Sequence, residues 1–527
     1  MSRTSTEVLG VDDGDIPAAL PEVSLAGAND GAPGPGAEAM GELTTSGSLL
    51  TRRVVHSTGA LLIRSAWERV TALGVVLVVA RLILPRQFGE ASLALSTVAF
   101  ATIIVDAGIT TALVRRRDNP TPADFAAARR VQFALAVGVL ALAAVAFVFN
   151  HSFGSLVFID ALQLLTDPFV LEKKVRLERT LEFKGLATAD GAGILTRSGV
   201  SLLVVLVDRG PLCLVLGDLS AAIVYAGVVV FLLRPAVAEH QDARPRPTAK
   251  GLLGEGLPFQ LFGLINSLRD ASSSALISGL AGLTALGLFQ FAYRMVSPMW
   301  LILASLNQLS VAVGMHLARG GRGTAERTKD GYLLAGLATA MMMATVAASA
   351  HWLVPALFGA RWSQSVPLIL AMAFGVVING PAIGFGIGLI FAADRGPRFG
   401  TVAALAAAVV FLLGLVGFHA LGGQRSLSLA WVSSAVFEAV IILYGCHRCV
   451  GLRLLRQTLI PIPVFIVAYL AGYEIPSGVH GRLVPILMSA GVAAAVSIGC
   501  TAVFGLPAAR RLWRATRVSR ATPGGNL

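Results

Sequence analysis

Leu82–Ala94 (LILPRQFGEASLA) and Leu280–Ala292 (LAGLTALGLFQFA) can be overlaid position by position so that Phe88-Gly89 falls on Leu286-Gly287. Both stretches lie at the start of an apolar segment, although few of their residues are identical. The overlay predicts two repeated units of six helices each. Because six is an even number, the units share one orientation in a membrane and are related by an axis along the membrane normal.

Apolar segments recur along the 527-residue chain, which is 55% hydrophobic, 14% charged and has a mean hydropathy of +0.74. A run of about 20 apolar residues is long enough to cross a bilayer as a helix, so a polytopic all-α membrane protein is predicted. We expect about fourteen spans, at roughly 58–83, 89–113, 125–149, 154–171, 186–207, 211–233, 257–281, 284–310, 331–357, 366–391, 399–420, 428–446, 458–473 and 483–505.

The polar interruptions divide these spans into domains. The longest one after the N-terminal tail carries Pro235, Pro245 and Pro247 and follows the sixth span. We therefore expect a disordered tail (1–50), an N-lobe (51–233), a linker (234–256), a C-lobe (257–446), two further helices (447–505) and a basic tail (506–527).

The positive charge indicates the orientation. Most of the 42 Lys and Arg fall on one side of the predicted spans, which places both termini in the cytosol. The net charge of +12 does not indicate nucleic-acid binding, because the basic residues lie in short clusters between apolar spans.

The predicted connections on the non-cytosolic side of the membrane are too short for an external catalytic domain. We expect no cofactor and no metal site, and the lone Cys446/Cys449 pair is interpreted as two ordinary thiols.

Arginines near the middle of apolar spans are the candidate binding residues: Arg69, Arg197, Arg269 and Arg294. A central arginine facing lipid costs roughly 2.5 to 3.5 kcal/mol or more, so such residues face a bundle interior or a watery cavity. Their bidentate, permanently charged guanidinium groups suit a pyrophosphate. Arg64 is also a candidate, although Glu68 lies on the same helix face and can neutralise it. The alternative is that each arginine is neutralised by a nearby carboxylate and only holds helices together.

Acidic residues inside the spans are candidates for ion coupling or for counter-charges: Glu68, Asp106, Asp218, Asp270 and Glu438. A counter-charge role is favoured for Asp106 and Asp270. Asp270 is adjacent to Arg269 and is expected to point elsewhere, since neighbours in a helix diverge by about 100°. Gly380, Gly384 and Gly388 share one helix face, which predicts close helix packing, with a bend at Pro381 as the alternative.

Four segments carry a family resemblance: ARLILPRQFG (80–89), DAGITTALVRR (106–116), LERTLEFKGLA (177–187) and LFGARWSQSVP (357–367). In this order and spacing they resemble the Wzx-like polysaccharide transporters and lipid-linked oligosaccharide flippases of the multidrug/oligosaccharidyl-lipid/polysaccharide exporter superfamily, over about residues 55 to 510.

The resemblance implies a MATE-like fold of two six-helix lobes plus two C-terminal helices, around a cationic cavity with alternating access. It implies a bacterial cytoplasmic-membrane flippase of a polyprenyl-pyrophosphate-linked glycan for capsule, exopolysaccharide or O-antigen. Membrane lipids, a glycan polymerase and a chain-length regulator are its implied partners.

Two other functions remain open from the sequence. A cation-coupled multidrug exporter of the same superfamily would need buried acids to outnumber buried bases, which is not the pattern here. A membrane glycosyltransferase, ligase or polymerase would bind the same lipid-linked sugars, but such enzymes usually carry sizeable external loops.

Overall fold

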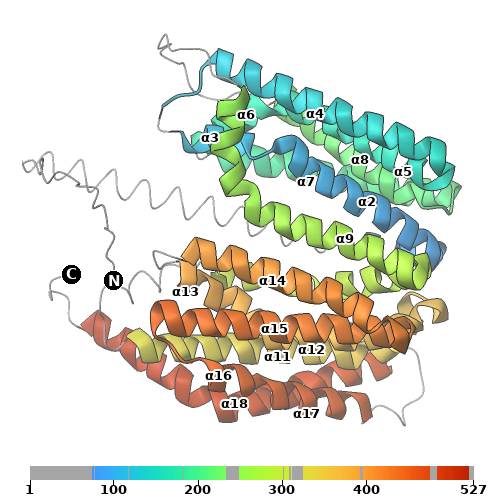
Figure 1. The fold of residues 1–527 in the computed structure, drawn as a ribbon. Coiled ribbons are helices and arrows are strands. Elements are labelled where there is room, and N and C mark those ends of the chain that lie inside the picture. Colours follow the sequence, from blue (N-terminus) through green and yellow to red (C-terminus); the bar gives the residue numbers. More distant parts are fainter. Residues whose placement is uncertain are drawn as a thin grey trace, which may run out of the picture. The chain divides into compact units, whose positions relative to one another are not determined.

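The computed structural model describes residues 74–75, 78–116, 118–180, 182–232, 249–300, 302–307, 310, 324–391, 396–474 and 484–521, all within one compact unit, His56–Leu527. Within these residues the regular elements are helices (Figure 1). The predicted tail 1–50 and most of the predicted first span lie outside the described residues, as do Arg64, Glu68 and Arg69.

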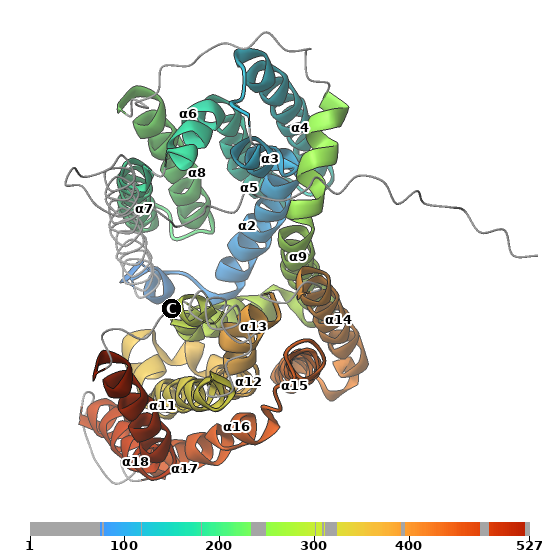
Figure 2. The ribbon, with the colours of Figure 1, turned by 90° about the vertical axis from the view of Figure 1, so that its left-hand side faces the viewer.

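The first group of helices, which we call the N-lobe, packs together on one side of the unit (Figure 2). Its elements are α2 (Pro85–Asp106), α3 (Ile109–Arg115), α4 (Pro122–Phe149), α5 (His151–Ala161), the 3₁₀ turn η1 (Leu162–Leu165), α6 (Asp167–Arg179), α7 (Phe183–Val207), α8 (Leu212–Gly227) and the π-helical turn η2 (Val228–Leu232).

The second group packs around α11. It comprises the helices from α11 to α18, so it differs from the predicted range 257–446, and we call this group the C-lobe from here on. Its elements are α11 (Thr324–Leu357), the 3₁₀ turn η3 (Ala360–Ser365), α12 (Val366–Pro381), the π-helical turn η4 (Ala382–Gly386), α13 (Ile387–Phe391), α14 (Gly396–Gly417), the 3₁₀ turn η5 (His419–Leu421), α15 (Gly423–Val450), α16 (Leu455–Leu459), α17 (Pro461–Glu474) and α18 (Val484–Ala521). The last two long helices, α17 and α18, pack on α11 and on each other.

Local sequence signals set several helix boundaries. Pro85 stands at the first turn of α2, where its missing N–H is no loss. Thr121 and Asp124 form a reciprocal capping box at the start of α4. The predicted span 89–113 is divided into α2 and α3 by Ala107 and Gly108, both in the left-handed region.

The helix α9 (Ala249–Val296) contacts both groups and lies between them in Figure 2. It covers the predicted span 257–281 and the first part of the span 284–310, with a break at Gly282, whose φ is 87°. A positive φ of this kind is accessible to glycine at no steric penalty.

The described residues contain eleven helices long and apolar enough to cross a membrane, or twelve if the pair α5/η1 and α6, bent by 44°, forms one span. The chain is therefore a multi-pass, all-helical membrane protein, as the sequence predicts. The number of fourteen spans stays a prediction, because much of the first one lies outside the described residues.

The two overlaid sequence stretches meet at the contact between α2 and α9. A Cβ atom on Gly89 would overlap the carbonyl oxygen of Leu283, and one on Gly287 would overlap that of Pro85. The two contacts exchange under the sequence overlay, because Pro85 corresponds to Leu283 and Gly89 to Gly287. Glycine is needed at both positions for the backbones to approach this closely.

Side chains at the same end of the helices add to this junction. The indole Nε1 of Trp362 donates to the carbonyl oxygen of Ala80 at 2.7 Å, and its ring packs on Phe88 and Phe291. Arg81 donates through Nη2 to the carbonyl oxygen of Ala356 at 2.8 Å, near the carboxyl end of α11. A cation is favourable there because the last carbonyl groups of a helix carry partial negative charge.

Candidate functional site

One cavity lies between α9 and the C-lobe helices α12, α14 and α15, and has a volume of about 220 Å³. We call it the C-lobe cavity. It is lined by Asn266, Arg269, Tyr293, Trp300, Asn379, Ile383, Ile387, Ala403, Ala404, Phe411, Trp431, Ser434, Ala435 and Glu438. Two of the candidate residues from the sequence, Arg269 and Glu438, are therefore brought to one cavity.

Negative groups compensate the charge of Arg269. Its Nε lies 3.1 Å from Oδ1 of Asp270, so the expectation that these neighbours point apart is wrong. A long side chain can bend back along the helix, and the partly buried guanidinium gains a counter-charge by doing so. Glu438 on α15 also acts on Arg269 electrostatically, and its Oε2 accepts a hydrogen bond from Asn379 Nδ2 at 3.0 Å.

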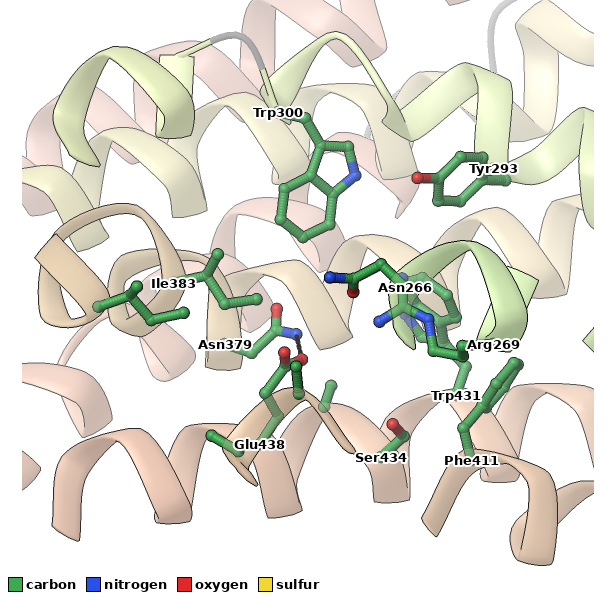
Figure 3. A pocket seen from close by; sticks show the side chains of 14 residues that line it. Asn266, Arg269, Tyr293, Trp300, Asn379, Ile383, Phe411, Trp431, Ser434 and Glu438 are labelled. Atoms are coloured by element: carbon green, nitrogen blue, oxygen red, sulfur yellow. Dashed lines mark hydrogen bonds between the residues drawn. The ribbon is translucent and has the colours of Figure 1, made fainter. Parts of the chain in front are cut away.

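Aromatic side chains form much of the remaining wall. Tyr293, Trp300, Phe411 and Trp431 line the cavity, and Figure 3 shows Trp300 across it from Asn379 and Glu438. Trp431 is held edge-to-face by Phe411, with ring centroids 5.9 Å apart. The amide oxygen of Asn379 is buried and has no hydrogen-bond partner within the described residues. The cavity thus combines aromatic rings with an amide, a hydroxyl and a compensated charge pair.

A second cavity of about 220 Å³, the N-lobe cavity, lies between α7 and α8 next to η1. Arg197 forms an ion pair there with Asp218 of α8, rather than with Asp190, which is on its own helix. Gln163 Nε2 lies 3.4 Å from Oδ2 of Asp218. Arg197 is thus neutralised by a carboxylate from a neighbouring helix, which sequence spacing along α7 could not reveal.

Asp160 is a buried acid that is not among the candidates selected from the sequence. It is fully buried on α5, and its Oδ1 accepts a hydrogen bond from Gln163 Nε2 at 2.9 Å. Its other oxygen has no partner within the described residues. The signal for it is a lone carboxylate in the apolar run Leu156–Leu165 (LVFIDALQLL), which is the pattern expected of a functional or paired acid.

Arg294 differs from Arg197 and Arg269 in its contacts. Its guanidinium carbon lies 4.8 Å from the ring centroid of Phe88, which is a cation–π contact between α9 and α2. It makes no ion pair within the part of the chain that the structure describes. Arg197 and Asp218, which line the N-lobe cavity, act on it electrostatically. Arg294 therefore supplies positive charge at the junction of the lobes without a direct carboxylate partner.

Asp106 has neutral partners. It accepts hydrogen bonds from the hydroxyl of Thr110 and from Nε2 of Gln132, the latter at 3.4 Å. These two hydrogen bonds account for a carboxylate at the end of α2. The role of Arg64, Glu68 and Arg69 stays a prediction, because they lie outside the described residues.

The glycine face on α12 and the following turn packs closely, as the sequence predicts. Cβ atoms on Gly380 and Gly384 would lie against Leu303, and one on Gly388 would overlap Ser310. After Pro381 the helix passes into the π-helical turn η4, where Ile383 offers its carbonyl to Asn307 Nδ2 at 3.2 Å. Such π-turns are common at functional sites, and Ile383 lines the C-lobe cavity.

One solved structure shows a similar fold. The chain is similar to the lipid II flippase MurJ in an inward closed conformation, with a TM-score of 0.68 and 11% identity, over 84% of this chain and 98% of that one. A multidrug resistance MATE family transporter in an inward-facing conformation aligns with a TM-score of 0.46 and 16% identity, over 74% of this chain and 98% of that one. No curated protein sequence matches this chain.

A family model described as "Polysaccharide biosynthesis protein" matches residues 78–367, more than half of the chain. The match confirms the resemblance to the Wzx-like transporters that the four sequence segments indicate. The chain belongs to the polysaccharide biosynthesis protein family.

Proposed function

We propose that this protein is a flippase that moves a polyprenyl-pyrophosphate-linked oligosaccharide, or a related lipid-linked polysaccharide unit, across the bacterial cytoplasmic membrane. The head group crosses between the lobes while the lipid tail stays in the bilayer. Family membership and the flippase-like fold support this class of cargo.

The observation that carries the proposal is Arg294. It is a guanidinium at the junction of the lobes whose charge no carboxylate neutralises directly within the described residues. Because an uncompensated cation at this depth is expensive, a phosphate group is the partner that would balance it. Arg197 acts on Arg294 electrostatically. It can give up its ion pair with Asp218 and bind the same phosphate group instead.

The lobe junction supports alternating access. On the orientation that the Lys and Arg distribution predicts, the contacts of Gly89, Gly287, Trp362 and Arg81 lie at the outer ends of the helices. In this orientation the two lobes are closed against each other on the non-cytosolic side of the membrane. Two similar units that touch through equivalent glycines can part there by a rigid-body rotation.

We further infer that transport is coupled to an ion gradient. Asp218 and Glu438 line the two cavities, and Asp160 is buried with one oxygen unpartnered within the described residues. Carboxyl groups of this kind can load and release an ion as the cavity changes sides.

The test is transport in proteoliposomes of an undecaprenyl-pyrophosphate-linked N-acetylglucosamine, read out by the access of its sugar to an external lectin. Wild-type protein should accelerate the exchange over protein-free vesicles. Arg294→Ala should reduce it at least tenfold, about 1.4 kcal/mol or more, and Arg294→Lys only in part. Arg510→Ala, an exposed change on α18, is the control.

Four outcomes would each contradict a part of the proposal. Transport at the wild-type rate by Arg294→Ala would remove the anion site. Export of ethidium without any movement of the lipid-linked sugar would favour a multidrug exporter, and a lengthened glycan would favour a glycosyltransferase. With a proton or sodium gradient imposed across the vesicle membrane, unchanged transport after a protonophore and a sodium ionophore would exclude ion coupling.

A further inference from the structure

The C-lobe cavity differs from an anion site in its charge balance. Arg269 contacts Asp270 and lies in the field of Glu438, so little net positive charge is left for a phosphate. A neutral polar ligand would leave these pairs intact. A dianion would have to displace them or be bound against two nearby carboxylates.

The walls offer both kinds of contact that a sugar ring uses. A pyranose has apolar C–H faces, which pack on aromatic rings, and hydroxyl edges, which both donate and accept hydrogen bonds. Trp300 and Tyr293 present aromatic rings on one side of the cavity, and Asn379, Ser434 and Glu438 present polar atoms on the other (Figure 3). Aromatic side chains with such polar neighbours give a large contact area at a small loss of conformational entropy.

A buried polar atom in this wall needs a partner. The Oδ1 atom of Asn379 is buried and without a partner in the described part of the chain, and Asn379 as a whole is 4% exposed. Figure 3 shows this oxygen on the side of the amide away from Glu438, facing the space below Trp300. A buried acceptor left unpaired is destabilising, and a ligand hydroxyl that donates to it would remove this penalty.

We propose that the C-lobe cavity is a neutral sugar subsite, in which one pyranose ring of the lipid-linked glycan packs on Trp300 and donates a hydroxyl hydrogen bond to Asn379. This inference rests on the proposed function and adds a division of labour to it. The junction arginine Arg294 takes the pyrophosphate, and the C-lobe cavity takes the sugar.

The experiment compares two kinds of ligand on the full-length protein in detergent. One is a short-chain prenyl pyrophosphate, and the others carry glucose, galactose or N-acetylglucosamine on the same pyrophosphate. At least one sugar-bearing ligand should bind about tenfold more tightly than the bare one, as one or two hydrogen bonds and a ring contact would give. Affinities are measured by isothermal titration calorimetry.

Variants assign this gain to the cavity. Trp300→Leu should abolish the gain in affinity that the sugar gives and leave the affinity for the bare prenyl pyrophosphate unchanged. Trp300→Phe should keep most of that gain in affinity. Trp352→Leu is the matched control, because Trp352 does not line the cavity. Arg294→Ala should weaken all the ligands equally. Should Trp300→Leu not fold, Ser434→Ala offers a milder change with the same expected direction.

The two proposals fail differently. If no sugar-bearing ligand binds more tightly than the bare one, or if Trp300→Leu, or Ser434→Ala in its place, keeps the gain, the sugar subsite is wrong and the flippase proposal stands. If none of the prenyl pyrophosphates binds to the wild type, the flippase proposal fails and the subsite with it.

Discussion

At the scale of single residues, the three described arginines of the candidate site have different partners. Arg269 is neutralised by its neighbour Asp270, Arg197 by Asp218 from another helix, and Arg294 rests on the face of Phe88. Charge compensation, not position in a span, decides what each can bind. This is why we place the phosphate at Arg294 and a neutral group beside Arg269.

The hydrogen bond of Trp362 gives a residue-scale prediction. Trp362→Phe should lower the free energy of unfolding by about 1 kcal/mol, because the fully buried indole loses its bond to Ala80 while its ring contacts persist. Chemical denaturation in detergent measures the change.

Trp352 provides the control, since its Nε1 has no partner within the described residues. Trp352→Phe should therefore leave the stability within a few tenths of a kcal/mol. Equal effects of the two substitutions would mean that the bond to Ala80 does not stabilise the lobe junction.

At the scale of elements, α18 is fastened to α11 at its polar end. Arg511 donates from Nε to Oδ2 of Asp330 at 2.8 Å and from Nη2 to Oδ1 at 2.6 Å, and Asp330 is buried. This bidentate pair fixes two helices that are far apart in sequence.

Loss of that pair is predicted to loosen α18. Arg511→Ala should destabilise the protein by about 1 to 3 kcal/mol, because the buried carboxylate of Asp330 loses its charged partner. Its exposed neighbour allows a matched control, Arg510→Ala. Thermal unfolding and hydrogen exchange of α18 measure the difference, and an identical result for both variants would refute the prediction.

The contact between α2 and α9 belongs to the scale of the whole molecule. Gly89 and Gly287 correspond to each other in the sequence overlay, and their backbones approach closely at this contact. Backbone atoms fill the space that a Cβ would need at either position, so a methyl group can be accommodated only if the helices separate.

Gly89→Ala and Gly287→Ala are therefore expected to shift the population toward a state open at this junction. Spin labels at Arg86→Cys and His419→Cys, both exposed sites, should report a longer mean distance in a cysteine-free background. Gly199→Ala is the control, because nothing lies within 4 Å of a Cβ built there. Unchanged distances in both variants would show that the glycine contact does not hold the lobes together.

The sequence by itself determined the membrane class and the helical fold, because apolar segments of bilayer length can bury their backbone polar groups only as helices. It also selected Arg269 and Glu438, since charges inside apolar spans stand out. Tertiary structure alone decided which charges neutralise one another, that Asp160 is fully buried, and that Trp300 and Asn379 share a cavity. The reason is physical: helix periodicity fixes which residues share a face, whereas ion pairs and cavities arise between helices whose packing the local sequence does not specify.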